Sequence, residues 1–193
     1  YLTAEEIAEI MFDDGRAEEY LKLKGEPATE ENIEKLKTDF IDIVKENKDA
    51  DAIIMTANAG SIVGGEFDYI YDIKTQDGKS YISAGTSIGA STSPLGFSIS
   101  VVKFVHLVQG IDLSDEKVRQ DILSGVTFTG SVFAGIGVGA QIPIYSDYAG
   151  KVAIYLIGIG TPSVGGGIGN SESVDDKKAK IERDIQDNLY GLD

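Results

Sequence analysis

The middle of this chain is an almost uncharged stretch in which bulky aliphatic residues alternate with very small ones. Residues 125–170 contain one acidic and one basic residue, Asp147 and Lys151, and hold 12 of the 23 glycines. From 126 to 144, every second residue is mostly Val, Ile, Phe or Ala, and those between are mostly Gly, Ser or Thr. A period of two is the pattern of a β-strand with two different faces. The stretch therefore predicts long strands and excludes a helix there.

The two ends of the chain have the opposite character. Residues 1–50 contain 15 acidic and 7 basic residues, and residues 171–193 contain 7 acidic and 4 basic ones. Thr3 with Glu6 forms a capping-box pattern, and Thr29 is placed to cap a longer helix. The expected helices run from Thr3, from about 16 to Leu23, over 30–48, over 115–123 after Ser114, and from Ser173 with Asp176 onward, the last carrying Ile181, Ile185 and Leu189.

Between these helices the pattern predicts about seven strands. Their expected ranges are 52–63, 66–74, 80–91, 95–108, 125–145, 151–160 and 163–171. Sequential neighbours of this kind pair as an antiparallel meander. Glycines let long strands bend, and closure into a barrel removes apolar edges that would otherwise aggregate. We therefore expect an α+β fold, a single domain over 1–193 with a strongly curved or closed barrel, and a two-sheet sandwich as the alternative.

Alternation alone leaves open which face of the sheet points inward. In one arrangement the Gly, Ser and Thr face lines a narrow barrel and the helices cover the aliphatic face. In a second, the small face meets water and the aliphatic face fills the core. In a third, the aliphatic face meets lipid and the small face lines an aqueous lumen, as in membrane barrels. The hairpin 131–160 has the length and the absence of charge that this third arrangement needs.

Composition excludes several kinds of chemistry. The net charge of −15 repels phosphate backbones and disfavours nucleic-acid binding. Cysteine is absent, which rules out thiol catalysis, and His106 is the one histidine, which rules out a multi-histidine metal site within one chain. The Gly-x-Gly runs lie inside expected strands, which is the wrong context for a nucleotide loop. We therefore predict no catalytic residue, no cofactor and no metal.

Three carboxylates share one side of the expected strand 66–74. Glu66, Asp68 and Asp72 alternate with residues such as Phe67 and Tyr69. This pattern is typical of a strand whose polar face meets water, and that is our interpretation. The alternative is a hydrolase-type enzyme in which crowded carboxylates act as an acid–base pair. That alternative requires the carboxylates, or His106, to converge in a pocket.

Aromatic residues along the strands suggest a binding surface. Tyrosine is amphipathic and loses little entropy when it binds a partner. The predicted ligand-binding residues are Tyr69, Tyr71, Tyr81, His106 and Tyr155. The expected partner is another protein or a small apolar ligand, with a membrane as a second possibility, and the oligomeric state is left open.

The segment from Ser131 to Ser171 reads SVFAGIGVGAQIPIYSDYAGKVAIYLIGIGTPSVGGGIGNS. Its alternating small residues, its Tyr-Ser-Asp…Gly-Lys turn and its return strand resemble glycine-rich β-domains near the C-termini of secreted bacterial polymorphic-toxin proteins. The likeness spans about 40 residues. It implies a bacterial, exported, modular parent, which the start at Tyr1 also suggests, although a cytoplasmic location stays open. Our hypothesis is a non-enzymatic binding module of a secreted, toxin-associated protein, with a pore-forming toxin or the hydrolase as alternatives.

Overall fold

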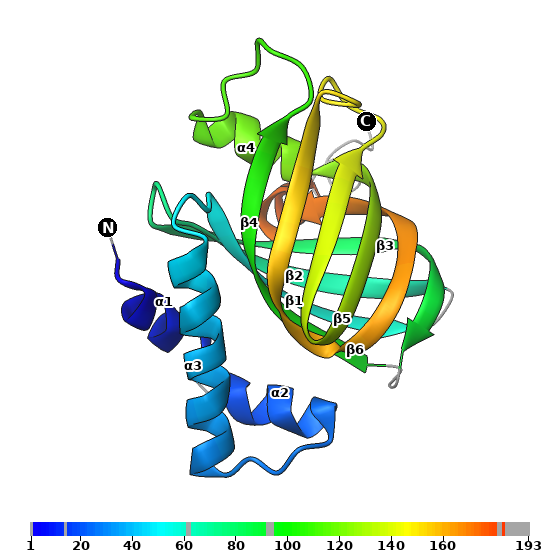
Figure 1. Ribbon diagram of the computed structural model, residues 1–193. Coiled ribbons are helices and arrows are strands. Elements are labelled where there is room, and N and C mark those ends of the chain that lie inside the picture. Colours follow the sequence, from blue (N-terminus) through cyan, green and yellow to red (C-terminus); the bar gives the residue numbers. More distant parts are fainter. Residues whose placement is uncertain (1, 14, 61–62, 92–94, 181–182, 184–193) are drawn as a thin grey trace.

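The computed structural model describes residues 2–13, 15–60, 63–91, 95–180 and 183, without the side chains of 60, 87–91 and 95. Helices gather at one side and one end of a curved sheet (Figure 1). The helices are α1 (Ala4–Met11), α2 (Arg16–Lys24), α3 (Glu30–Glu46) and α4 (Glu116–Leu123). The strands are β1 (Ala52–Gly60), β2 (Val63–Asp72), β3 (Asp77–Ser91), β4 (Leu95–His106), β5 (Gly125–Pro143) and β6 (Val152–Ser173). A further helical segment covers 174–180.

The helix starts follow from local hydrogen bonds, as the sequence predicts. The Glu6 amide donates to Thr3 Oγ1 at 3.1 Å, and the Thr3 amide donates to Glu6 Oε2 at 2.8 Å. The Asn32 amide likewise donates to Thr29 Oγ1 at 3.2 Å. These caps satisfy N–H groups that have no partner within the helix.

The last two helices start close to the predicted positions. The Asp176 amide donates to Ser173 Oγ at 3.1 Å, which confirms that cap. The N-cap of α4 is Asp115 instead of the predicted Ser114. The predicted apolar residues of the last helix, Ile181, Ile185 and Leu189, lie outside the described residues.

The sheet closes into a barrel, which confirms the α+β barrel and rules out the sandwich. Its strand order is β3-β2-β1-β4-β6-β5, and β3 also pairs with β6, so five strands form a ring. The simple meander is wrong, because β4 pairs with β1 instead of its sequence neighbour β3. The described strands number six, because the predicted turn at Thr161 and Pro162 lies within β6. There β6 changes partner, pairing with β4 over 152–160 and with β3 over 163–173.

Strand β5 folds back on itself inside the curve of β6 (Figure 1). Gly135 has φ +98, a backbone conformation that favours glycine, and the register with β6 shifts beside it. The ends of β5 meet where the Ile144 amide donates to the Val126 carbonyl at 2.9 Å. The two halves of β5 therefore lie side by side and complete the barrel wall.

Two apolar cores hold the helices to the barrel. The first lies outside the wall, where α1, α2 and α3 cover outward side chains that come mainly from β1 and β4. These sheet residues are Ile53, Met55, Tyr71, Phe97, Ile99, Val101 and Ile159. The second lies inside one end of the barrel, where Ile122 of α4 and Leu113 pack on inward residues such as Ile54, Val102 and Ile154. Helix α4 thus closes this end.

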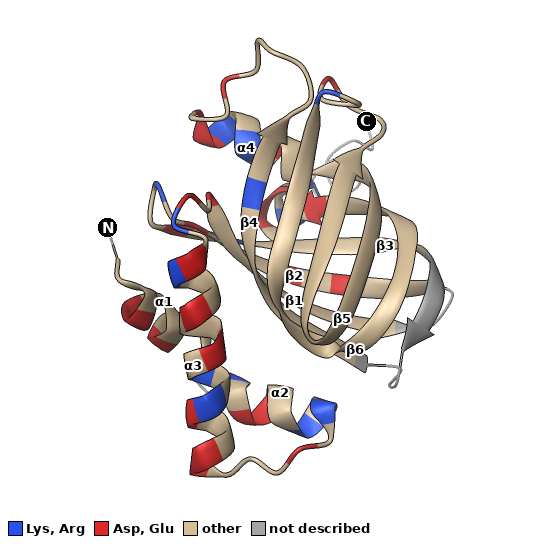
Figure 2. Ribbon diagram, in the orientation of Figure 1, with Lys and Arg blue, Asp and Glu red and all other residues tan. Residues whose placement is uncertain are grey.

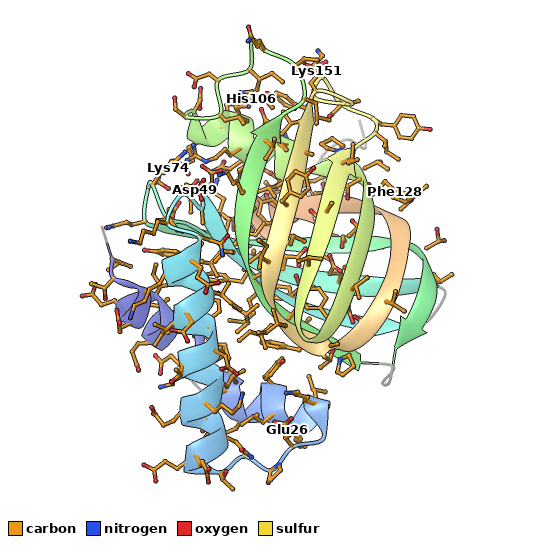
Figure 3. The ribbon with its side chains drawn as sticks, viewed as in Figure 1. Glu26, Asp49, Lys74, His106, Phe128 and Lys151 are labelled. Atoms are coloured by element: carbon orange, nitrogen blue, oxygen red, sulfur yellow. The ribbon has the colours of Figure 1, made fainter. Side chains whose placement is uncertain are left out.

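The part of the outer wall that the helices do not cover is apolar and exposed. On β5 the aliphatic residues point outward, and Ile136 and Val138 are 63% and 56% exposed. Figure 3 shows Phe128 of β5 pointing away from the barrel, and Figure 2 shows the charged residues gathered on the helices and loops instead of this wall. The Gly, Ser and Thr face of β5 points inward, so the arrangement with that face in water is wrong. The helix-covered arrangement holds for β1 and β4 and is wrong for β5.

Candidate functional site

The barrel holds a cavity of about 560 Å³. All six strands and Leu123 of α4 contribute to its lining. Most lining residues are small or polar, and the inward residues of β5 include Thr127, Thr129, Ser131 and Gln141. Small side chains on a curved wall leave the middle of the barrel empty, whereas larger ones would fill it. The period-two pattern therefore produces a hollow barrel once the small face points inward.

Two carboxyl groups enter this cavity from β2. Glu66 and Asp68 are two residues apart on one strand and share its inward face. Asp68 is 4% exposed, and Thr56 Oγ1 of β1 donates to Asp68 Oδ1 at 2.6 Å. The prediction that both carboxylates share one side is confirmed. The water-facing interpretation is wrong for both, because the barrel closes around them.

Burial and mutual repulsion hold a proton on this pair. Burial and then the charge of Asp68 raise the pKa of Glu66 to about 8, and a hydrogen bond between the two groups adds to the effect. Burial also raises the pKa of Asp68, while hydrogen bonds from Thr56 and Glu66 oppose that shift. The pair therefore retains at least one proton at neutral pH, held between Glu66 and Asp68.

No side chain of Lys, Arg or His lines the cavity among the described residues. The other titratable group there is Tyr81 of β3, which lies opposite Asp68 in the strand pairing. Burial first, and then the charge of Asp176 and other carboxylates, raises the pKa of Tyr81 to about 12. The cavity thus presents negative charge and neutral polar groups.

Buried hydroxyl groups complete the polar lining. Ser100 of β4 and Thr127 of β5 are 1% and 8% exposed and line the cavity. The Ser100 and Thr127 hydroxyls can donate to and accept from a molecule inside the cavity. The alternation of small polar residues along the strands is the sequence feature that could have predicted Ser100, Thr127 and Thr56 as lining residues.

The structure does not bring the five predicted ligand-binding residues together. Tyr81 alone of them lines the cavity. Tyr71 is buried under the N-terminal helices, with Tyr69 packed at the edge of the same core. His106 lies at the end of β4 near α4 (Figure 3), where its Nε2 is 2.7 Å from the Ile111 carbonyl oxygen. Tyr155 is exposed on the outer wall.

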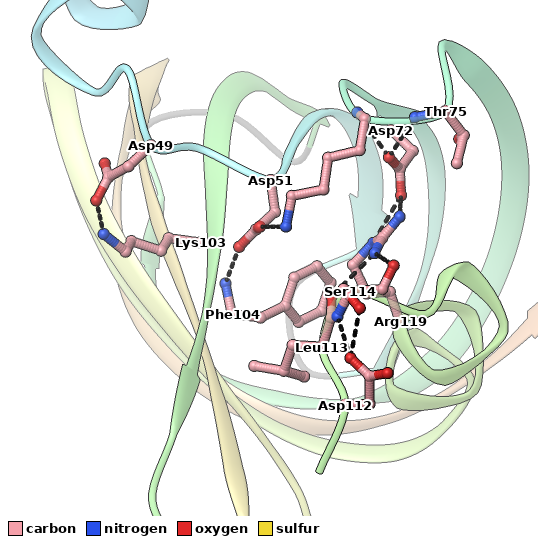
Figure 4. Close-up of polar contacts among 11 residues, drawn as sticks. Asp49, Asp51, Asp72, Thr75, Lys103, Phe104, Asp112, Leu113, Ser114 and Arg119 are labelled. Carbon is pink, nitrogen blue, oxygen red and sulfur yellow. Dashed lines mark hydrogen bonds and ion pairs between the residues drawn. The ribbon is translucent and has the colours of Figure 1, made fainter.

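Asp72, the third carboxylate of β2, has a different role from Glu66 and Asp68. Its Oδ2 accepts from Arg119 Nε at 2.7 Å, and it ties α4 to the barrel (Figure 4). Within the described ranges, no three Asp, Glu or His side chains are grouped so that they could hold a metal ion. In the same part of the chain, no helix is long and apolar enough to cross a membrane.

The fold and the cavity define a class, namely a small α+β barrel with a hollow polar interior. No family model matches the sequence, and no curated protein matches it. A solved structure to which the chain is similar is the virulence-associated protein VapB from the intracellular pathogen Rhodococcus equi. The identity is 9%, the TM-score is 0.32, and the match covers 63% of this chain and 94% of VapB. A likeness of this size carries no argument about fold or function.

Proposed function

We propose that this protein is a non-enzymatic binding module that holds a small polar ligand inside its barrel. The observation that carries the proposal is the cavity of about 560 Å³ that contains the Glu66–Asp68 pair. Ligand pockets of proteins commonly have volumes of about 300–1,000 Å³ and a few convergent polar groups. The secreted, toxin-associated parent protein stays a prediction from the sequence resemblance.

The lining combines polar groups with apolar side chains such as Phe133 and Leu156, so it suits a ligand with polar groups as well as apolar surface. Thr56, Ser100 and Thr127 present oxygen atoms, and the carboxyl pair adds charge. An apolar ligand would leave these buried groups without partners, which is costly. A ligand rich in hydrogen-bond donors and acceptors satisfies them.

A matched pair of substitutions on β5 tests whether the cavity is the binding site. Ser131→Trp places an indole in the cavity, whereas Val132→Trp places it on the outer wall, because Ser131 lines the cavity and Val132 is exposed. A library of polar fragments, containing cationic, neutral and anionic compounds, is screened by NMR. We expect fragments that shift the amide signals of Glu66 and Ser100 in the wild type and in V132W, with at least a tenfold loss of affinity in S131W.

Two results would contradict this function. If no fragment perturbs the cavity signals in the wild type, the cavity is not a binding site. If a bound fragment is chemically changed, and the change stops in Glu66→Gln, the protein is the acid–base enzyme of the alternative hypothesis, because two carboxyl groups do converge in a pocket.

Contact with lipid is a second candidate function, and the bare outer wall favours it. The outward residues of β2, β3, β5 and β6 form an exposed apolar band: Val63, Phe67, Ile82, Phe128, Val132, Ile136, Val138, Val164 and Ile168. Cross-strand partners such as Phe67 and Ile82, or Val132 and Val164, make this band continuous. Large exposed apolar patches mark interaction sites, and a polar lumen with an apolar exterior is the arrangement of membrane barrels.

Dye release from phosphatidylcholine vesicles tests this second candidate. These vesicles carry no net charge, so they do not repel a protein of net charge −15. We expect release by the wild type and at least a fivefold loss in I136D/V138D, because charge at lipid-facing positions is costly. Ile10→Asp on α1, which is also exposed, is the control and should release dye like the wild type. Absence of release by the wild type from pH 4 to 8 would remove this candidate.

A further inference from the structure

We infer that the ligand of the barrel cavity is an organic cation that binds at the Glu66–Asp68 pair. This inference rests on the proposed function, since it assigns a chemical class to the ligand of the same site. The charge of the cavity, its size and the hydroxyl groups of its lining each support it.

The charge in the cavity has one sign. Glu66 and Asp68 are the acidic side chains of the lining, and the described lining contains no basic one. Two basic residues outside the lining already have partners. The Arg119 guanidinium is bonded to Asp72 and to the carbonyls of Leu113 and Ser114, and Lys79 of β3 donates to Gln120 Oε1. An anion would enter without a counter-charge and beside a carboxylate. A cation supplies the charge that the pair lacks.

The size of the cavity favours an organic molecule over a metal ion. A volume of about 560 Å³ accommodates a chain or ring of many atoms, not one ion with its ligands. Calcium takes six to eight oxygen ligands, and no cluster of three candidate side chains occurs among the described residues. An ammonium or guanidinium group needs fewer partners and brings several N–H donors.

The hydroxyl groups of the cavity lining suit such donors. Ser100 and Thr127 lie on β4 and β5, whereas the carboxyl pair lies on β2, so acceptors surround the cavity on several strands. The hydroxyl oxygens accept hydrogen bonds from N–H groups, and the Asp68 carboxylate accepts more strongly because it is charged. A ligand with ammonium groups at both ends of a flexible chain can reach both sets.

Binding of a cation changes the protonation of Glu66. With its pKa raised to about 8, Glu66 is mostly neutral at pH 7, and a nearby positive charge lowers that pKa. The carboxyl O–H bond then breaks, the electron pair stays on the carboxylate, and the proton leaves to solvent. The titratable groups that face Glu66 are Asp68 on its own strand and Tyr81 on β3, while the lining residues of β1, β4, β5 and β6 carry none. Affinity for a cation should therefore rise between pH 6 and 9.

Three six-carbon probes that differ in charge test the inference by isothermal titration calorimetry. They are 1,6-diaminohexane, 1,6-hexanediol and adipate. We expect 1,6-diaminohexane alone to bind, at least tenfold more tightly at pH 9 than at pH 6. At pH 7 the measured heat should differ between phosphate and Tris buffers by the amount that release of up to one proton predicts.

Variants locate the effect at the carboxyl pair. Glu66→Gln should abolish the pH dependence and the proton release, and Asp68→Asn should weaken 1,6-diaminohexane binding at least tenfold. Asp147→Asn is the control, because Asp147 is an exposed carboxylate in the hairpin loop. Circular dichroism establishes that each variant is folded. If a variant is not folded, the pH dependence and buffer dependence of the wild type decide the inference by themselves.

The outcomes separate this inference from the proposed function. Binding of 1,6-hexanediol or adipate that is lost in S131W would overturn the cation class and leave the binding function intact. Binding of 1,6-diaminohexane that E66Q and D68N do not change would overturn the assignment to this pair. If none of the probes binds at pH 9, the cation class is wrong, and the fragment screen decides the binding function separately.

Discussion

Replacing Arg119 by methionine is expected to destabilise the protein by about 3–5 kcal/mol. Arg119 is 1% exposed, and its Nε and Nη2 lie 2.7 and 2.6 Å from Asp72 Oδ2. Its Nη1 donates to the carbonyl oxygens of Leu113 and Ser114 at 2.9 and 2.8 Å (Figure 4). Methionine fills similar space but leaves one carboxylate and two carbonyls without these donors. Removing one partner of a buried ion pair is strongly destabilising, because the other charge stays behind.

Urea denaturation measures this effect, and Lys117→Met is its matched control. Lys117 lies on the same helix and pairs with Asp121 at 2.8 Å, but both side chains are exposed. That substitution removes the same charge and should leave the stability close to that of the wild type. In D72N/R119M the loss should be smaller than the sum of the single losses. A loss below about 1 kcal/mol in R119M would show that the ion pair does not hold α4 on the barrel.

The free energy of unfolding should fall by about 2–3 kcal/mol as the pH rises from 5 to 9. The folded protein raises the pKa of Glu66 from 4.5 to about 8. The folded state therefore binds this proton more tightly than the unfolded state does. The resulting stability is fully present below pH 4.5, and it is lost as the pH rises towards and through 8. The Glu66 side chain is only partly buried, so the expected loss is smaller than the full pKa shift implies.

Denaturation of the wild type and of E66Q at several pH values checks this prediction. Glutamine does not titrate, so E66Q should lose most of the decline between pH 5 and 9. Glu172→Gln removes a carboxylate that lies opposite Ile82 in the sheet pairing, outside the cavity lining, and it should keep the decline. A wild-type stability that is flat or rises over this range would contradict the protonated state of Glu66.

Local and periodic features of the fold were predictable. Thr3 and Thr29 cap helices because the partners of their side chains lie three residues away, within the same short segment. The shared side of Glu66 and Asp68 follows from their spacing on one strand. The bend at Gly135 was not predicted, and the bend at Thr161–Pro162 was predicted as a turn between two strands. In both places the strand bends without ending.

The predicted tyrosines lie on different faces of the sheet because of the way the strands pair. Tyr81 points inward because it lies opposite Asp68, and residues directly opposite each other share a face of the sheet. Tyr69 and Tyr71 occupy the other face of β2, which meets the N-terminal helices. Tyr155 lies opposite Lys103 and points outward. Residue type alone does not reveal these faces, since each depends on a partner strand.

By itself the sequence determined the helix caps, the two-faced strands of the middle and the absence of thiol and multi-histidine chemistry, because these depend on neighbouring residues or on composition. The tertiary structure alone decided which face of the strands points inward, and that the interior is hollow and acidic. Those properties arise when β3 pairs with β6 across a long stretch of chain and closes the ring. Ring closure creates the interior of the barrel, and the size of the inward side chains then determines the volume of the cavity.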